Sequence, residues 1–188
     1  MMVSIIGCSG SSESDDSDTP ENTSDIKTEI STTESSSIIN IAKEEQENLM
    51  YSPEVDSTYL YWVNNELIIL NGSTKCNIFA LNVLSKAGYK TPDENALAAD
   101  LFDTSLFKDI LPVIGVNDIS GAIKGDLVIW SYHVIIFESL ININGEEYAF
   151  AWWAGTRQSD NGNNIKNNVC FGKYKLDGDY VVRRPLKK

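Results

Sequence analysis

Apolar residues recur with a helical period after the polar segment Asn71-Gly72-Ser73-Thr74. They are Cys76, Phe79, Ala80, Val83, Leu84 and Ala87, spaced at i, i+3, i+4, i+7, i+8 and i+11. This spacing puts them on one face of an α-helix, and Gly88 can end that helix. The pattern predicts a helix that begins near Cys76 and buries this face.

Two further helices are predicted on either side of it. The first is short, covers Ile38 to Met50 and is capped near Ser37. The second begins at Thr91-Pro92-Asp93-Glu94, where Thr91 caps, Pro92 takes the first helical position and Glu94 bonds back to the cap. We expect it to extend to Leu101 or Phe102.

The period changes to that of strands after Gly125. Five segments are rich in β-branched and aromatic residues: 126–130, 132–140, 147–153, 169–176 and 180–184. Turn residues separate them, among them Asn144-Gly145 and Asp177-Gly178. Helices followed by an antiparallel meander predict an α+β fold. Segments 59–63 and 67–70, around Asn64-Asn65, fit either strands or the edges of a pocket, because their periodicity favours neither.

Charge divides the chain into a tail and a domain. Eight acids and one lysine give residues 9–40 a charge of −7 out of the chain's −12. The ten serines and the acids of residues 9–37 predict a disordered tether, since few apolar groups offset the entropy of ordering. The whole chain is 42% hydrophobic, and residues 38–188 are long enough to form one domain with a core. We expect this domain to be a monomer. An acidic chain without a basic stripe is not expected to bind nucleic acid.

Residues 1–8 end in Ile5-Ile6-Gly7-Cys8, which resembles the bacterial lipobox, where the cysteine is lipidated. The resemblance implies a signal remnant, a membrane anchor through lipid on Cys8 and a protein that faces the extracytoplasmic side of the cell envelope. A signal peptide also needs a basic start and about 7–15 apolar residues, of which only the last few are present. The alternative is a cytoplasmic protein with a disordered acidic N-terminus.

Candidate chemistry rests on Cys76 and His133. The cysteines Cys8, Cys76 and Cys170 are too few and too far apart for a disulfide scaffold or a CxxC metal site, and one histidine makes a zinc site improbable, so no cofactor is expected. A thiolate is favoured at a helix N-terminus, where Cys76 is predicted to lie. His133 is the only imidazole available as its base. A Cys76–Cys170 disulfide is the alternative that would remove the nucleophile.

Three segments, in this order, resemble the NlpC/P60 and CHAP-like cysteine amidases of bacterial cell walls, which share a papain-like core. They are Thr74 to Ala80 at the nucleophile, Gly125-Asp126-Leu127-Val128-Ile129-Trp130, and His133-Val134-Ile135-Ile136-Phe137. The resemblance spans roughly residues 59–184. It implies a papain-like fold with Cys76 and His133 catalytic, acting on an amide of the peptidoglycan stem peptide or of its junction with the glycan.

The sequence departs from the family around the nucleophile and at the third catalytic position. The family's Asp-Cys-Ser-Gly is Lys75-Cys76-Asn77-Ile78 here. A two-residue turn at Asn144-Gly145 would set His133 opposite Thr156, which is a weak orienter of an imidazole. Asp160, a backbone carbonyl or water could serve instead, whereas Glu138 should point to the other face of its strand.

Three functions therefore stay open. The first is a peptidoglycan amidase with a thioester intermediate, and the second is an amidase that acts on another amide. The third is a catalytically inactive lipoprotein of the same fold that binds a cell-wall peptide or a partner protein.

Overall fold

The computed structural model describes residues 37–155 and 169–188, which fold into helices and an antiparallel sheet, as the α+β prediction requires. The first helix covers residues 37–44 and passes into two 3₁₀ turns, η1 (Glu45–Glu47) and η2 (Leu49–Tyr51). The helix predicted for Ile38 to Met50 is thus present, but its second half is 3₁₀. Asn48, between the turns, accepts the N–H of Met50 on its side-chain oxygen and so caps η2.

A small hairpin precedes the central helix. Strands β1 (Ser57–Leu60) and β2 (Glu66–Ile69) pair antiparallel in a two-stranded sheet of their own. Asn64 and Asn65 both have positive φ, 49° and 57°, a conformation that asparagine tolerates better than most residues. Segments 59–63 and 67–70, for which the sequence left strands and pocket edges open, thus contribute to the strands of this hairpin.

The helix predicted to begin at Cys76 is α2 (Cys76–Lys86), and Gly88 follows it with φ +80°. Both predicted ends are confirmed. The helix predicted from Thr91 is wrong at its start, because only α3 (Ala98–Phe102) is helical. Tertiary hydrogen bonds hold the preceding segment out of a helix: the carbonyl of Glu94 accepts the Trp62 indole, and that of Ala96 accepts the Asn77 amide.

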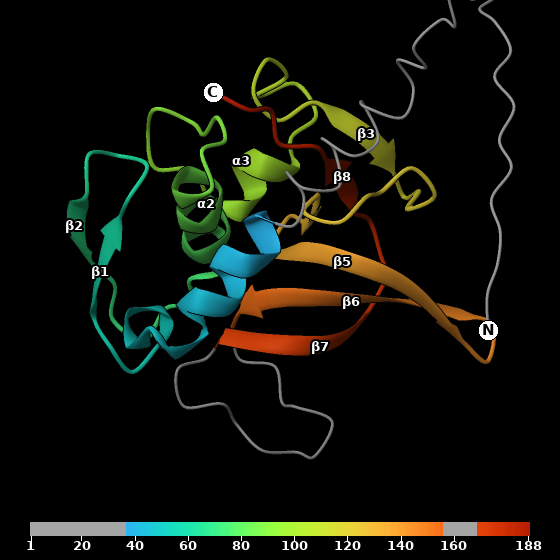
Figure 1. Cartoon of the computed structure of the whole chain (residues 1–188), viewed down its shortest axis with the longest axis horizontal. Coiled ribbons are helices and arrows are strands. Elements are labelled where there is room, and N and C mark those ends of the chain that lie inside the picture. Colours follow the sequence, from blue (N-terminus) through green and yellow to red (C-terminus); the bar gives the residue numbers. More distant parts are fainter. Residues whose placement is uncertain (1–36, 156–168) are drawn as a thin grey trace, which may run out of the picture.

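The main sheet has six strands in the order β3-β8-β4-β5-β6-β7. Its members are β3 (Val113–Val116), β4 (Leu127–Trp130), β5 (His133–Ile143), β6 (Glu146–Ala154), β7 (Val169–Lys175) and β8 (Val181–Arg183). The five predicted strands are confirmed, and β3 was missed. The expectation of a meander holds for β4 to β7 only, because β8 returns to pair with β4 and β3 lies beyond it (Figure 1).

The sheet divides the core into two clusters. On one side, which we call the helix face, α2 packs on residues that include Val134, Ile136, Trp152, Ala154 and Val169. The opposite side, the inner face, carries residues that include Val128, Trp130, Ile135, Trp153 and Cys170. Trp152 and Trp153, which are neighbours in β6, thus lie on opposite faces of the sheet, and both are buried.

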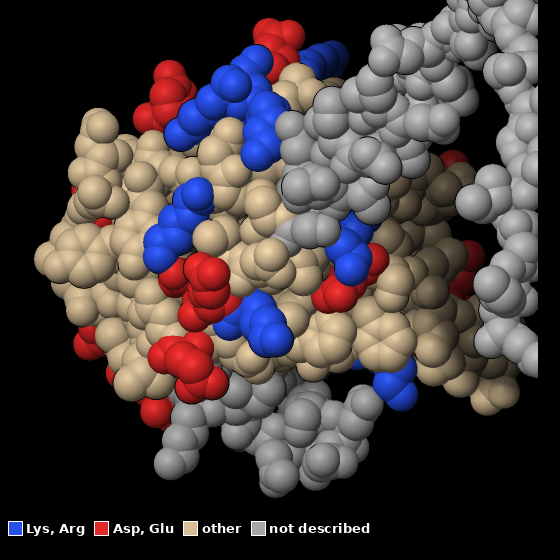
Figure 2. Space-filling view, in the orientation of Figure 1, with Lys and Arg blue, Asp and Glu red and all other residues tan. Residues whose placement is uncertain are grey.

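The inner face is curled upon itself. The ring of Tyr174 on β7 lies 5.1 Å from the ring of Trp130 on β4, although two strands separate them in the sheet order. Small residues at Ala149, Ala151 and Gly172 line this face, so the strands can coil around the aromatic rings. On the side of the molecule seen in Figure 2, acidic and basic side chains are interspersed.

Candidate functional site

Cys76 is the first residue of α2 and is 3% exposed. Its helix begins at this point because Lys75 has a non-helical backbone, with φ −127° and ψ 34°, while the carbonyl of Lys75 accepts the N–H of Phe79. The lower turns of α2 bury Phe79, Ala80 and Val83 against the helix face of the sheet. Cys76 therefore sits where free N–H groups of a helix start are available.

The Cys76 thiol has backbone N–H groups as its polar neighbours. Burial raises the pKa of the thiol, and hydrogen bonds from the N–H groups of Val134, Asn77 and Cys76 itself lower it in part. The free thiol in this structure is thus held neutral by its surroundings, while the donors that would stabilise a thiolate are in place.

His133 is the first residue of β5 and pairs with Trp130 at the end of β4. Its ring stacks on Tyr174, with centroids 5.1 Å apart and planes at 21°, and lies 6.5 Å from the Trp130 ring. Since Trp130 belongs to the inner cluster and Val134 to the helix-face cluster, the imidazole leaves β5 on the inner face.

The contact that links the two candidate residues runs through the backbone of β5. Val134, whose N–H bonds the Cys76 thiol, is the residue that follows His133. The pairing of β5 with β6 begins only at Ile136 and Trp152, so the strand ends beyond that pair leave room for the start of α2. The structure therefore brings Cys76 to the residue next to His133, while the His133 side chain leaves β5 on the opposite face from that of Val134.

The predicted partner of His133 needs a correction. Near the turn, Ile143 pairs with Glu146 as expected, but a β-bulge between Phe137 and Ser139 shifts the register by one residue. Continuing the shifted register aligns His133 with Gly155 and not with Thr156. Gly155 indeed lies against the imidazole: a Cβ there would be 3.2 Å from Cε1 of His133.

The remaining candidates for orienting the imidazole fall into two groups. Thr156 and Asp160 lie outside the described residues. Glu138 is on the helix face, where its carboxylate accepts the Trp152 indole N–H at 2.8 Å, as predicted from its odd separation from His133.

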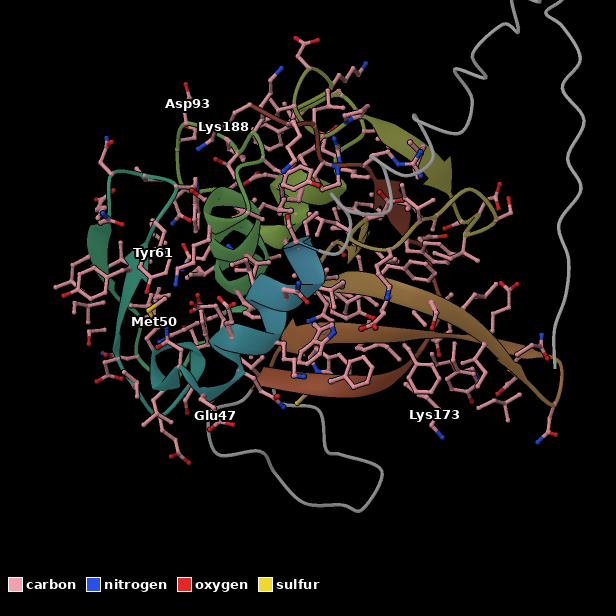
Figure 3. All side chains as sticks on the ribbon, viewed as in Figure 1. Glu47, Met50, Tyr61, Asp93, Lys173 and Lys188 are labelled. Atoms are coloured by element: carbon pink, nitrogen blue, oxygen red, sulfur yellow. The ribbon has the colours of Figure 1, made fainter. Side chains whose placement is uncertain are left out.

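Sequence reasoning missed the role of Lys75, which is fully buried. Its ammonium donates to the carbonyls of Met50 at 2.6 Å and Val55 at 2.5 Å, and so ties the start of α2 to the segment before β1. Burial lowers the pKa of Lys75, and the Asp56 carboxylate opposes this. In Figure 3, Met50 lies beside Tyr61, whose hydroxyl donates to the Met50 sulfur at 3.6 Å. The available signal was a lysine directly before the candidate nucleophile.

Other expected groups can now be located. Cys170 lies on the inner face and Cys76 on the helix face, so no disulfide joins these two. In the described part of the chain, no three histidine, cysteine, aspartate or glutamate side chains gather as metal ligands would. No helix among the described residues is long and apolar enough to span a bilayer. Cys8 lies outside the described residues.

Comparisons of this chain with protein-family models, curated proteins and solved structures found no match.

Proposed function

We propose that residues 38–188 form a papain-like cysteine amidase in which Cys76 is the nucleophile and His133 the base. The observation that carries the proposal is the hydrogen bond from the N–H of Val134 to the Cys76 thiol, because Val134 directly follows His133. Thiol acyl transfer needs a base close to the thiol, and this contact sets the Cys76 sulfur against the backbone next to His133. The substrate class, a peptidoglycan amide, rests on the resemblance of the sequence to cell-wall amidases.

The steps follow from the groups at the site. His133 takes the thiol proton as the sulfur attacks the amide carbonyl, and the protonated imidazole then passes a proton to the departing amine. N–H groups at the start of α2 stabilise the oxyanion. Water, deprotonated by His133, finally hydrolyses the thioester and restores the thiol. Because burial keeps the free Cys76 thiol neutral, the proton transfer to His133 accompanies the attack.

The envelope location is part of the same proposal. Lipid on Cys8 would hold the domain on the extracytoplasmic side of the membrane, at the end of the acidic tether, where peptidoglycan is found. Growth of the producing cell with an alkyne-tagged fatty acid tests this: the chain should be labelled, and Cys8→Ala should not. Equal labelling of both chains contradicts the anchor.

A second candidate is a binding protein of the same fold that performs no hydrolysis. One observation favours it: Cys76 is only 3% exposed, so the free protein offers little of the thiol to an incoming amide.

The experiment that separates the two candidates measures new amino groups released from purified peptidoglycan. Cys76→Ala and His133→Ala should each abolish release, while Cys170→Ala, on the other face of the sheet, should retain it. In parallel, iodoacetamide at neutral pH should label Cys76 faster than Cys170, because backbone N–H groups lower the pKa of the Cys76 thiol in part. Wild-type protein that releases no amino groups from a panel of cell-wall preparations would favour the binding protein.

A further inference from the structure

The outer halves of β5, β6 and β7 form a part of the helix face that no described helix covers. The first helix lies across the other ends of these strands, at the end of β6 and the beginning of β7, and leaves the rest open in the view of Figure 1. Three neighbouring aromatic residues form what we call the aromatic platform: Phe150 and Trp152 on β6 and Phe171 on β7. Trp152 is two residues from the end of β6 and Phe171 is the third residue of β7, so these two lie beside the covered strand ends, and Phe150 lies farther out.

The rings of the platform are in mutual contact. Phe171 lies 4.6 Å from Trp152 and 6.0 Å from Phe150, and its ring is within 22° of parallel to that of Phe150. Trp152 is almost fully buried beneath its neighbours, whereas Phe171 is 43% exposed. The platform therefore presents one exposed ring, Phe171, held against two less exposed aromatic rings, and such a ring can stack on a flat ligand.

Polar groups of both signs border the platform. On the β5 side, Glu138 accepts the Trp152 indole N–H through one carboxylate oxygen and pairs with Lys124 at 3.3 Å through the other. On the β7 side, Lys173 pairs in register with Phe150 and projects at the edge of the ribbon (Figure 3). Ser139, opposite Phe150 on β5, is exposed. In Figure 2 the surface over these strands is largely uncharged, with charged side chains beside it.

This combination suits a sugar chain better than the other classes of partner. A pyranose ring presents C–H groups that pack flat on aromatic rings, while its hydroxyl and acetamide groups exchange hydrogen bonds with carboxylates, ammonium groups and hydroxyls at the rim. A protein partner would have to bury the Glu138–Lys124 pair, at a desolvation cost that a small apolar centre offsets poorly. The net charge of −12 opposes a nucleic acid.

We propose that the aromatic platform binds the glycan strand of peptidoglycan, with a sugar ring stacked on Phe171. This inference rests on the proposed function, since it assigns the glycan part of that substrate to a surface separate from Cys76. The binding step needs neither the thiol nor the imidazole, so it is measured in a chain without the nucleophile.

The test uses the full chain carrying Cys76→Ala and follows binding of the N-acetylglucosamine hexamer by titration calorimetry. Phe171→Ala in that background should raise the Kd by about tenfold or more, because the exposed stacking ring is lost. Val116→Ala, which changes a still more exposed apolar residue on β3, is the control and should leave the Kd unchanged. Phe150→Leu, which keeps an apolar side chain, should weaken binding less than Phe171→Ala does.

Three results would overturn the inference: no binding of the hexamer, equal Kd values for the Phe171→Ala and parent chains, or a Phe171-dependent affinity for the stem peptide alone. The third result would make the platform a peptide site. The outcome is independent of catalysis: a chain that binds the hexamer through Phe171 but releases no amino groups refutes the amidase and retains the platform. A chain that cleaves peptidoglycan equally well with and without Phe171, and does not bind the hexamer, retains the amidase and refutes the platform.

Discussion

Gly155 lies directly against the imidazole of His133, so that a Cβ at position 155 would be 3.2 Å from Cε1 and 3.9 Å from Nδ1. The imidazole is thus packed between the backbone at Gly155 and the ring of Tyr174, whose centroid is 5.1 Å from its own. Packing of this kind fixes the plane of the ring. An imidazole that must exchange protons with a thiol benefits from a fixed orientation.

The first prediction concerns Gly155→Ala. The added methyl group must displace the imidazole, and φ of +152° strains the alanine further. With His133 as the proposed base, amide hydrolysis should fall by about tenfold or more, since small displacements of a catalytic group have large effects. Gly178→Ala is the matched control, because Gly178 also has positive φ, +71°, but open space around its Cβ position. Both variants should lose about 1 kcal/mol of stability. Equal activity of the two variants would contradict the packing argument.

The second prediction concerns the buried ammonium of Lys75. Lys75→Met keeps the length of the side chain but leaves the carbonyls of Met50 and Val55 without their donor. The free energy of unfolding in urea should fall by about 1–3 kcal/mol, the cost of buried groups left unsatisfied. Amide exchange in the η2 segment and at the start of α2 should become faster. Lys90→Met changes an exposed lysine and should alter neither the free energy of unfolding nor the amide exchange of these segments.

The third prediction is a pH dependence of stability that belongs to Cys170. Burial raises the pKa of its thiol from 9.0 to about 11. Between these values the unfolded chain releases the thiol proton while the folded chain retains it, so stability falls as pH rises through this window. The loss attributable to Cys170 should approach about 3 kcal/mol, at roughly 1.4 kcal/mol per pH unit.

Denaturant unfolding of the wild type and of Cys170→Ala, at several pH values from 8 to 11, isolates this contribution. At pH 8 the free energy of unfolding of Cys170→Ala should be lower than that of the wild type, because the smaller side chain leaves a cavity. Its free energy of unfolding should, however, decline less steeply as the pH rises. Parallel declines would show that the thiol ionises at its ordinary pKa in the folded protein.

The fourth prediction assigns Asp126 of the Gly-Asp-Leu-Val segment a structural role. Its carboxylate is 1% exposed and accepts two hydrogen bonds from Arg184, at 3.1 and 2.9 Å, and one from the N–H of Ile123, at 2.8 Å. Burial raises its pKa, and these bonds oppose the rise. Asp126→Asn removes the charge from this pair and should cost about 1–3 kcal/mol of unfolding free energy.

The alkylation rate of Cys76 should be the same in Asp126→Asn as in the wild type, because the carboxylate is not among the groups that bond the thiol. Asp109→Asn, at an exposed position, serves as the control for stability. A large change in thiol reactivity without loss of stability would instead make Asp126 part of the site.

The sequence alone determined the elements whose signals are local. The apolar period from Cys76 to Ala87 fixed α2 at its first residue, because one face of that helix must be buried whatever it packs against. The alternation of β-branched and aromatic residues fixed β4 to β8 within a few residues, and Asn144-Gly145 fixed the β5–β6 turn. The same alternation predicted that Glu138 and His133 point to opposite faces of their strand, as they do.

The tertiary structure decided what the site looks like. The bulge after Phe137 inserts one residue into β5 and aligns His133 with Gly155, a change that leaves no trace in the local pattern of apolar residues. The helix signal at Thr91 lost to hydrogen bonds from Trp62 and Asn77, which are distant in sequence. Lys75 is buried only because two carbonyls from another segment meet its ammonium. Local pattern sets which residues are helical or extended, whereas strand register and buried polar partners depend on contacts between distant segments, which a single sequence does not encode locally.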